Sequence, residues 1–260
     1  MELLTVFFKT LAAFLIIQFQ FKINVNRLMR HLILILIFFA SVTSFAQEIN
    51  QLDANGERDG IWQKNFENTN QPRYEGTFKN GKEIGTFKFY KLVEKKSVLS
   101  ATKEFNENDN IALVKFYSST GKLISQGDMN GQAFIGKWMY YHNKTDAVMS
   151  TENYNDKGEL HGEKLVYYEN GQVAEKSNYI NGKQEGLSIW YSEKAVVLKE
   201  FLYENDELHG LSKYYDNKGQ LIAEGSYKRG QKHGVWKYYT DGKLTEEKDF
   251  TIHSKLEKNN

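Results

Sequence analysis

The sequence contains no cysteine and only one proline among its 260 residues. Without cysteine the chain has no disulfide framework, and no lipid-modified cysteine can tether it to a membrane. A single proline excludes a proline-rich linker. The formal net charge is only +1, which gives no reason to expect a nucleic acid or an anionic membrane as a partner.

Helical periodicity is also missing between residues 47 and 250, whereas aromatic residues are plentiful. They make up 14% of the chain, although hydrophobic residues as a whole reach only 40%. Tyrosine, phenylalanine and tryptophan fit the pleated surface of a sheet well. The composition therefore favours strands over helices.

The N-terminal region has the pattern of a secretory signal. From Met29 the chain reads Met-Arg-His, followed by the apolar run 32–40 and by Ser44-Phe45-Ala46. A charged start, a short apolar segment and small residues before the cut are typical of such signals. We expect cleavage after Ala46, because the apolar run is too short to span a membrane comfortably.

Residues 1–28 carry a second apolar stretch, from Leu3 to Phe21. Two such stretches in tandem are unusual for one signal, so the true start is expected at Met29. A two-helix membrane anchor is the alternative. The sequence thus divides into a hydrophobic leader (1–46), a repeat region (47–250) and a polar tail (251–260).

Glycines recur about every 24 residues through the repeat region, the mark of a repeat array. Most units contain the phrase Gly-x-x-x-Gly followed by an aromatic pair. Asp206 replaces the first glycine once, Gly131 is shifted by one residue, and Ile111 stands where one second glycine is expected. The predicted turn glycines are Gly56, Gly60, Gly81, Gly85, Gly136, Gly158, Gly162, Gly182, Gly186, Gly210, Gly230 and Gly234.

Each unit is expected to form one β-hairpin. Glycine supplies positive φ in tight turns, and the runs between the turns are rich in β-branched and aromatic residues. Pairs such as Asn170-Gly171 and Asp241-Gly242 mark the second turn of a unit. The predicted fold is all-β, a long twisted antiparallel meander of hairpins, preceded by the hydrophobic signal helix. The segment Val93–Asn110 breaks the period, so we expect a longer loop there.

Aromatic residues fall at alternating positions after the repeat glycines, so they should lie on one face of the sheet. Burial of that face would make them core, whereas an open face would make them a platform for a peptide, a glycan or a partner strand. The candidate binding residues are therefore Trp62, Trp138, Tyr140, Trp190, Trp236 and Tyr238.

The stretches Gly-Lys-Gln-Glu-Gly-Leu-Ser-Ile-Trp-Tyr (182–191) and Gly-Gln-Lys-His-Gly-Val-Trp-Lys-Tyr-Tyr (230–239) resemble MORN-type repeats. The likeness runs from Leu52 to Phe250, is strongest from Gly158 onward, and is closest to the bacterial variant repeat of the YwqK family of toxin–antitoxin antitoxins. It implies an antiparallel β-ribbon with a binding role and no catalysis. An antitoxin of that family would act in the cytoplasm, whereas the leader predicts export.

No catalytic constellation, metal site or cofactor site is predicted. His161, His209 and His233 precede repeat glycines, but neighbouring units are two strands, about 10 Å, apart, whereas zinc ligands lie about 2 Å from the metal. No phosphate-binding loop is present. An enzyme would need a cluster within 93–110, whose charged residues are Glu94, Lys95, Lys96, Lys103, Glu104, Glu107 and Asp109.

These observations predict a non-catalytic repeat scaffold that binds a protein or another envelope component. We expect it to be exported to the periplasm, the outer envelope surface or the extracellular space. It would meet a membrane only through an uncleaved leader. An antitoxin that neutralises a toxin by direct binding and a cell-surface glycan-binding module are the alternatives.

Overall fold

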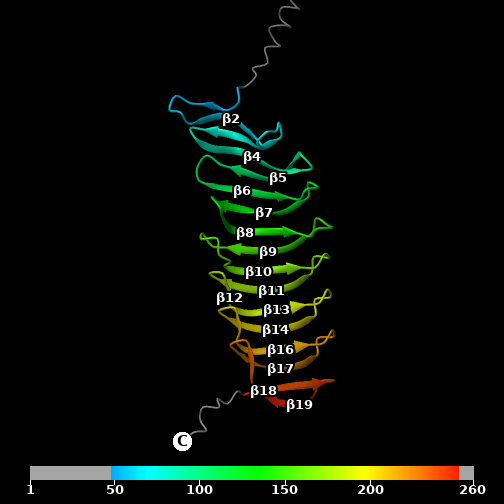
Figure 1. The fold of residues 1–260 in the computed structure, drawn as a ribbon. Helices are drawn as coiled ribbons and strands as arrows, with labels where there is room; N and C mark the ends of the chain where they lie inside the picture. Colours follow the sequence, from blue (N-terminus) through cyan, green and yellow to red (C-terminus); the bar gives the residue numbers. More distant parts are fainter. Residues whose placement is uncertain (1–47, 252–260) are drawn as a thin grey trace, which may run out of the picture. The chain divides into compact units, whose positions relative to one another are not determined.

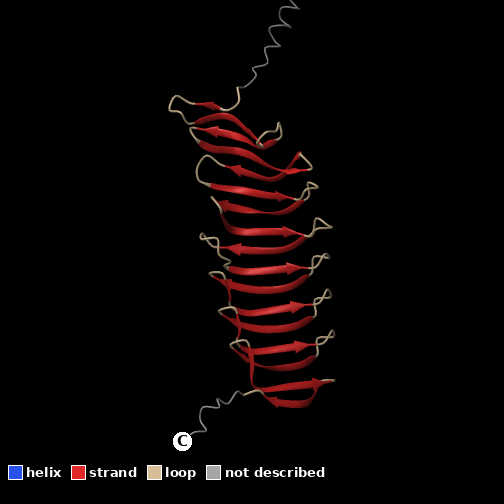
Figure 2. Ribbon diagram, viewed as in Figure 1, coloured by secondary structure: helices blue, strands red, loops and turns tan. Residues whose placement is uncertain are grey.

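The described part of the chain is one antiparallel sheet whose strands follow each other in sequence order. A computed structural model describes residues 48–251, which form strands and turns but no helix (Figure 1, Figure 2). The strands are β1 (Gln51–Leu52), β2 (Arg58–Asn65), β3 (Pro72–Lys79), β4 (Lys82–Val93), β5 (Lys96–Phe105), β6 (Ile111–Tyr117), β7 (Leu123–Asn130), β8 (Ala133–Tyr141), β9 (Val148–Tyr154), β10 (Gly162–Tyr167), β11 (Val173–Ile180), β12 (Lys183–Gln184), β13 (Gly186–Tyr191), β14 (Val197–Glu204), β15 (Glu207–Leu208), β16 (Gly210–Tyr215), β17 (Leu221–Lys228), β18 (Gln231–Thr240) and β19 (Lys243–Asp249).

Each strand pairs with its neighbours in the sequence, so the turns alternate between the two edges of the sheet. The short strand β12 is followed directly by β13, and both pair with β11. In the same way, β15 is followed directly by β16, and both pair with β14. The predicted all-β meander of hairpins is confirmed. The predicted signal helix and the tail from residue 252 lie outside the described residues. Within residues 48–251, no helix is long and apolar enough to cross a membrane.

A bend at the repeat glycine shapes the first strand of each unit. At Gly186 the backbone has φ 79°, a conformation that a residue with a Cβ adopts only with strain. The same sign of φ occurs at Gly60, Gly85, Gly136, Gly162, Gly210 and Gly234. The bend turns the residues before the glycine over one face of the sheet, and the regular ladder begins after it.

In the unit that lacks a repeat glycine, the residue equivalent to that glycine lies one position later than the sequence suggested. Ala112 pairs with Met129 in the way that Gly136 pairs with Tyr154. The expectation that Ile111 occupies the glycine position was therefore wrong. The cause is the long hairpin of β4 and β5, which adds residues to this unit and shifts all later positions.

The segment that breaks the period is mostly strand, which corrects the expected loop over 93–110. Strands β4 and β5 are joined by a tight turn at Glu94 and Lys95, both of which have positive φ. Only residues 106–110 form a loop, at the opposite end of β5. The extra residues of this unit therefore lengthen the strands instead of making one long loop.

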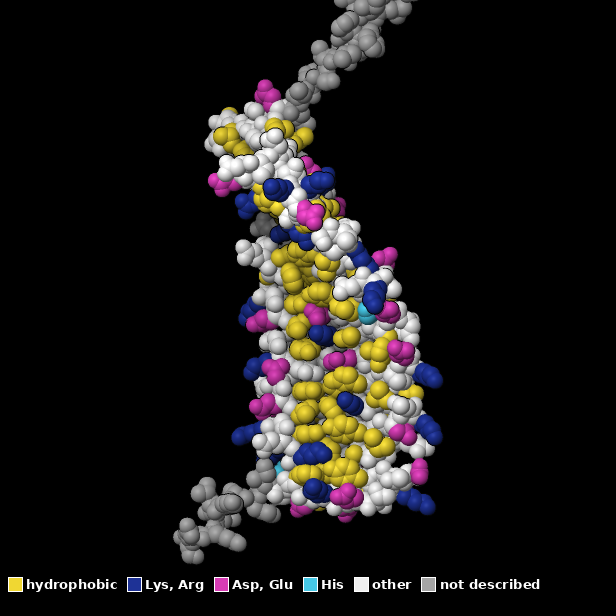
Figure 3. Space-filling view, turned by 45° about the vertical axis from the view of Figure 1, so that its right-hand side comes forward, with side chains coloured by type: hydrophobic (Ala, Val, Ile, Leu, Met, Phe, Trp, Pro, Cys, Tyr) yellow, Lys and Arg dark blue, Asp and Glu magenta, His cyan; other side chains and the backbone are white. Residues whose placement is uncertain are grey.

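The two faces of the sheet differ in burial. The face that carries Trp138 and Trp236 is here called the tryptophan face, and the face that carries Tyr90, Tyr215 and Tyr239 the tyrosine face. Figure 3 shows hydrophobic side chains gathered in a band along the sheet, with single charged side chains within the band and more toward its margins. The buried hydrophobic residues are Phe78, Phe87, Ala101, Ala112, Val114, Met129, Trp138, Ala223 and Trp236.

Both ends of the sheet are poor templates for further strands. The first strand, β1, has only two residues. The last, β19, is exposed throughout and carries lysine, glutamate and aspartate side chains. Short and charged edge strands disfavour pairing with another chain. The broad faces and the two rows of turns are therefore the surfaces available for binding.

Candidate binding surfaces

Two of the six candidate aromatic residues are completely buried. Trp138 and Trp236 have 0% of their surface exposed. The ring of Phe134 stacks on Trp138 with centroids 4.0 Å apart, and the indole Nε1 donates to the carbonyl of Asp128 at 2.9 Å. The Nζ of Lys232 lies 4.0 Å from the ring centroid of Trp236. Both tryptophans are core residues and present no open surface.

Phe134 and Lys232 occupy the same place in their units, two residues before the repeat glycine. Arg58 holds that place in the first unit, and its Cζ lies 4.8 Å from the ring centroid of Trp62. The bend at the glycine brings each of these side chains over the ring that follows it. The sequence analysis did not predict that these side chains cover the aromatic rings. The pattern that could have indicated it is a large side chain two residues before the second glycine of a unit.

The other four candidates are partly buried and already have partners in the sheet. Trp62 donates from Nε1 to the carbonyl of Gln51 at 3.0 Å. Trp190 packs on Phe201 with ring centroids 5.2 Å apart. The hydroxyl of Tyr140 lies 3.3 Å from that of Tyr154, and the hydroxyl of Tyr238 accepts a hydrogen bond from Lys232 at 3.1 Å. The six aromatic residues thus do not form one continuous exposed platform.

In the middle of the tryptophan face a charged pair replaces an aromatic residue. Lys164 lies where other units have tryptophan, and its Nζ is 2.9 Å from a carboxylate oxygen of Glu152. The same glutamate accepts a hydrogen bond from the hydroxyl of Tyr154 at 2.5 Å. Burial lowers the pKa of Lys164, but the hydrogen bond to Glu152 and the nearby charges, chiefly that of Glu152, together outweigh it, so the net shift is upward. Burial, followed by this hydrogen bond, raises the pKa of Tyr154.

The next two units carry serine at this place. Ser188 and Ser212 are fully buried, and so is Ser177 on a neighbouring strand. The hydroxyl of Ser188 accepts a hydrogen bond from Gln184 at 2.9 Å. The hydroxyls of Ser177 and Ser212 have no hydrogen-bond partner in the structure. The place two residues after the repeat glycine is therefore not aromatic in the units between Trp138 and Trp236, and the ring contacts on this side reach Trp236 through Phe201 and Tyr214.

On the tyrosine face, a tyrosine hydroxyl is repeatedly hydrogen-bonded to a glutamate on the preceding strand. Tyr90 donates to Glu75 at 2.8 Å, Tyr215 to Glu200 at 3.0 Å and Tyr239 to Glu224 at 2.8 Å. Burial and the bond to the carboxylate raise the pKa of Tyr90 to about 12, and the same causes raise that of Tyr215 to about 12. The hydrogen bond from Tyr90 in turn lowers the pKa of Glu75.

A column of aliphatic side chains runs along the same face. Each follows directly after a repeat glycine, and the exposed fractions are 47% at Leu187, 46% at Leu211 and 51% at Val235. Leu202 faces Leu187 across the strand pair and is also exposed. The predicted binding residues all lie at the alternate positions of the repeat, so these aliphatic residues were not predicted as a site. We call Leu187, Leu202, Leu211 and Val235 the aliphatic column.

The histidines of the turns are dispersed. The ring of His161 accepts a hydrogen bond from the backbone of Asn181 at 3.4 Å, and His209 lies 3.2 Å from a carboxylate oxygen of Glu204. Across residues 48–251, no three histidine, aspartate or glutamate side chains are grouped as a metal would require.

The charged residues of 93–110 are likewise spread out. Glu94, Lys95 and Lys96 lie at one end of β5, whereas Glu107 and Asp109 lie beyond the other end. A strand of this length spans about 30 Å. Lys103, Glu107 and Asp109 line one cavity, whereas Glu94, Lys95 and Lys96 lie at the far end of β5 from it.

Comparison with known proteins agrees with the repeat structure. The family model of the MORN repeat variant matches residues 160–181 and 208–229. No curated protein matches the sequence. Each matched segment begins two residues before a repeat glycine and ends within the next turn at the same edge, so it contains one hairpin, β10–β11 or β16–β17. These two segments therefore match the MORN repeat variant, which supports the resemblance to MORN-type repeats seen in the sequence.

Proposed function

We propose that the protein is a non-catalytic scaffold that binds a protein partner outside the cytoplasm, through the tyrosine face. The observation that carries the proposal is the aliphatic column. Leu187, Leu211 and Val235 remain about half exposed although they lie on a well-ordered sheet. Several exposed apolar side chains grouped on one face are typical of an interaction site.

The surroundings of the aliphatic column suit a protein partner. Tyrosine side chains such as Tyr215 and Tyr239 lie on the same face, with their hydroxyls held by glutamates. Tyrosine offers apolar area together with a polar tip, and aromatic residues are enriched in protein interfaces. MORN repeats are commonly protein-binding or membrane-binding modules, which is consistent with this role.

The test is capture of partners by the full chain from the native cell. The triple variant Leu187→Ser, Leu211→Ser and Val235→Ser should lose the captured protein while keeping its circular dichroism spectrum. The matched control replaces Thr86, Lys137 and Glu163 by serine, since these residues also directly follow repeat glycines. Equal capture by the two triple variants would reject the aliphatic column as the binding surface.

We also propose that the protein is exported. This distinguishes it from an antitoxin of the YwqK family, which would act in the cytoplasm. The pattern ending at Ala46 supports secretion with a cleaved leader. N-terminal sequencing of the native protein should find Gln47 first. An intact chain in the cytoplasm, encoded beside a toxin gene, would favour the antitoxin instead.

A further inference from the structure

The turns on one edge of the sheet are joined to each other by backbone hydrogen bonds. The second residue of each two-residue turn donates its N–H to a carbonyl of the preceding unit, two residues before the repeat glycine of that unit. These bonds are Gly81 to Arg58 at 2.9 Å, Gly182 to Leu160 at 2.8 Å, Asp206 to Gln184 at 3.1 Å and Gly230 to Leu208 at 2.9 Å. They close the spaces between successive turns.

This series of bonds is interrupted in the units that follow Gly81. Within the described residues, no backbone bond of this type joins the turn at 106–110 to the turn before it or to the turn at Gly131. The 106–110 turn is instead held internally. The side chain of Asn106 accepts hydrogen bonds from the backbone N–H groups of Asn108 and Asp109 at 2.7 and 3.0 Å, and Asp109 accepts one from Ile111 at 2.8 Å.

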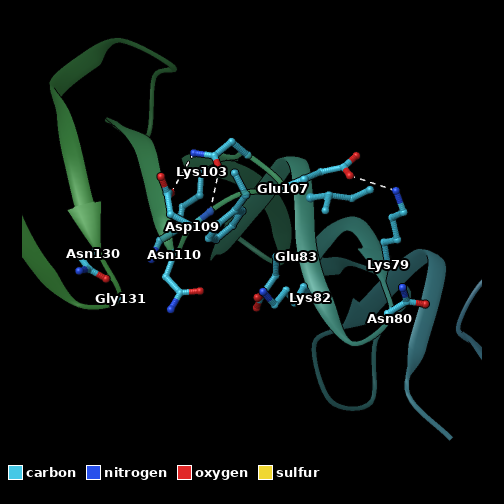
Figure 4. A pocket seen from close by; sticks show the side chains of 13 residues that line it. Lys79, Asn80, Lys82, Glu83, Lys103, Glu107, Asp109, Asn110, Asn130 and Gly131 are labelled. Atoms are coloured by element: carbon cyan, nitrogen blue, oxygen red, sulfur yellow. Dashed lines mark hydrogen bonds and ion pairs between the residues drawn. The ribbon is translucent and has the colours of Figure 1, made fainter. Parts of the chain in front are cut away.

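A cavity of about 600 Å³ opens where the bonds are missing (Figure 4). It is bounded by the β3–β4 turn at Lys79–Lys82, the 106–110 loop and the β7–β8 turn at Asn130 and Gly131. Figure 4 shows Lys79 and Asn80 on one side, Asn130 and Gly131 on the other, and Glu83 and Asn110 between them. The hollow therefore lies beside the irregular unit, where the bonds between successive turns are missing.

Four of the polar side chains that line the cavity form hydrogen bonds or ion pairs with each other. Lys79 and Glu107 form an ion pair at 3.0 Å, and the amide of Asn106 donates to Asp109 at 2.9 Å. The remaining polar side chains of the lining make no hydrogen bond or ion pair to the rest of the described chain. They are Asn80, Lys82, Glu83, Lys103, Asn110 and Asn130.

The chemistry of this lining indicates an uncharged ligand rich in hydroxyl groups. Three lysines in the lining are balanced by Glu83, Glu107 and Asp109, so the cavity has no net charge to attract an ion. Asparagine side chains both donate and accept hydrogen bonds. Phe105 and Ile84 add apolar surface to the same wall. Amides and charged groups beside an aromatic ring match a sugar, which has hydroxyls at its rim and C–H groups on its faces.

We propose that this cavity binds a neutral saccharide of one or two sugar rings. Its volume lies within the usual range for small-molecule sites, about 300–1,000 Å³. The cavity lies apart from the aliphatic column, in the units from Gly81 to Gly131, so the two sites can be tested independently. A glycan site would let the scaffold engage cell-surface carbohydrate and a protein partner through different surfaces.

The experiment is saturation-transfer NMR on the full chain with glucose, galactose, N-acetylglucosamine and maltose as separate probes, and with sialic acid as an acidic probe. We expect saturable binding of at least one neutral sugar. The double variant Asn110→Ala and Asn130→Ala removes two unengaged amides, so its affinity should fall about tenfold or more. The control Asn217→Ala, an exposed turn residue at the other edge of the sheet, should bind normally.

Thermal unfolding of the double variant checks that the sheet is intact, and Lys103→Met provides a second, single-site test of the same wall. Unchanged affinity in both folded cavity variants would overturn the proposal. So would binding of sialic acid alone, because it would show that charge and not hydroxyl recognition governs the site. Absence of binding by all four neutral sugars would also overturn it.

Discussion

The indole ring of Trp236 lies directly against the backbone of Gly225 on the neighbouring strand. A Cβ added to Gly225 would approach the ring to 2.3 Å, well inside van der Waals contact. Trp138 lies on Gly127 in the same way, at 2.6 Å. Glycine is required at these two strand positions because the ring occupies the space of a side chain.

We therefore expect Gly225→Ala to destabilise the protein by about 1–3 kcal/mol, since the ring must shift out of a well-packed site. The matched control is Ser177→Ala, at the equivalent place opposite Lys164. It removes an unpartnered buried hydroxyl and should be neutral or slightly stabilising. Urea unfolding of both variants gives the comparison. Equal stability of the two would contradict the close contact between ring and backbone.

Replacing Trp236 by alanine should cost about 3–5 kcal/mol, because the side chain is fully buried. Val235→Ala, one residue earlier and on the tyrosine face, should change stability by no more than about 0.5 kcal/mol. Denaturant unfolding measures both values. If the order of the two effects were reversed, the assignment of faces would be wrong.

Gly234→Val should destabilise by about 1–3 kcal/mol, since φ is 68° and a β-branched residue resists that conformation. Asparagine tolerates this region better, so Gly234→Asn should cost clearly less. Thermal denaturation followed by circular dichroism ranks the variants. A cost for asparagine as large as that for valine would show that space, rather than backbone conformation, requires glycine.

Alkaline pH should destabilise the sheet through its tyrosine–glutamate pairs. Tyr90 and Tyr215 have pKa values of about 12 in the folded protein, above the ordinary value of 10. The folded state therefore keeps protons that the unfolded state releases, so their contribution is complete below pH 10 and is lost as pH rises toward 12. Absorbance titration at 295 nm should show tyrosines that ionise late. The double variant Tyr90→Phe and Tyr215→Phe should have a smaller late-ionising fraction and a weaker loss of stability above pH 10.

The hairpins and their faces could be predicted because turns and strands have local sequence signals. The glycine pairs locate the bends, as at Gly182 and Gly186, and alternation after the second glycine places Trp236 and Tyr238 on one face. The repeat position at Ala112 was predicted one residue too early. The length of the β4–β5 hairpin is set by strand pairing, and no turn residue in the sequence specifies it.

The binding surfaces could not be predicted in the same way. The cover of Trp138 by Phe134 depends on how far the bend at Gly136 turns the chain, which periodicity does not describe. The cavity depends on hydrogen bonds between turns that are distant in sequence, and on their interruption by the internal bonds of Asn106. Such features arise from the contact of one unit with the next.

Pairing only between strands adjacent in sequence has a consequence for how such a chain can change in length. Residues 187–210 form one complete unit, and their removal would bring Gly186 to the place of Gly210, with the order of faces and edges preserved. Duplication of a unit would preserve them equally. Gene duplication and loss can thus lengthen or shorten this protein in whole hairpins, and the irregular unit around Asn106 would keep its cavity through such changes.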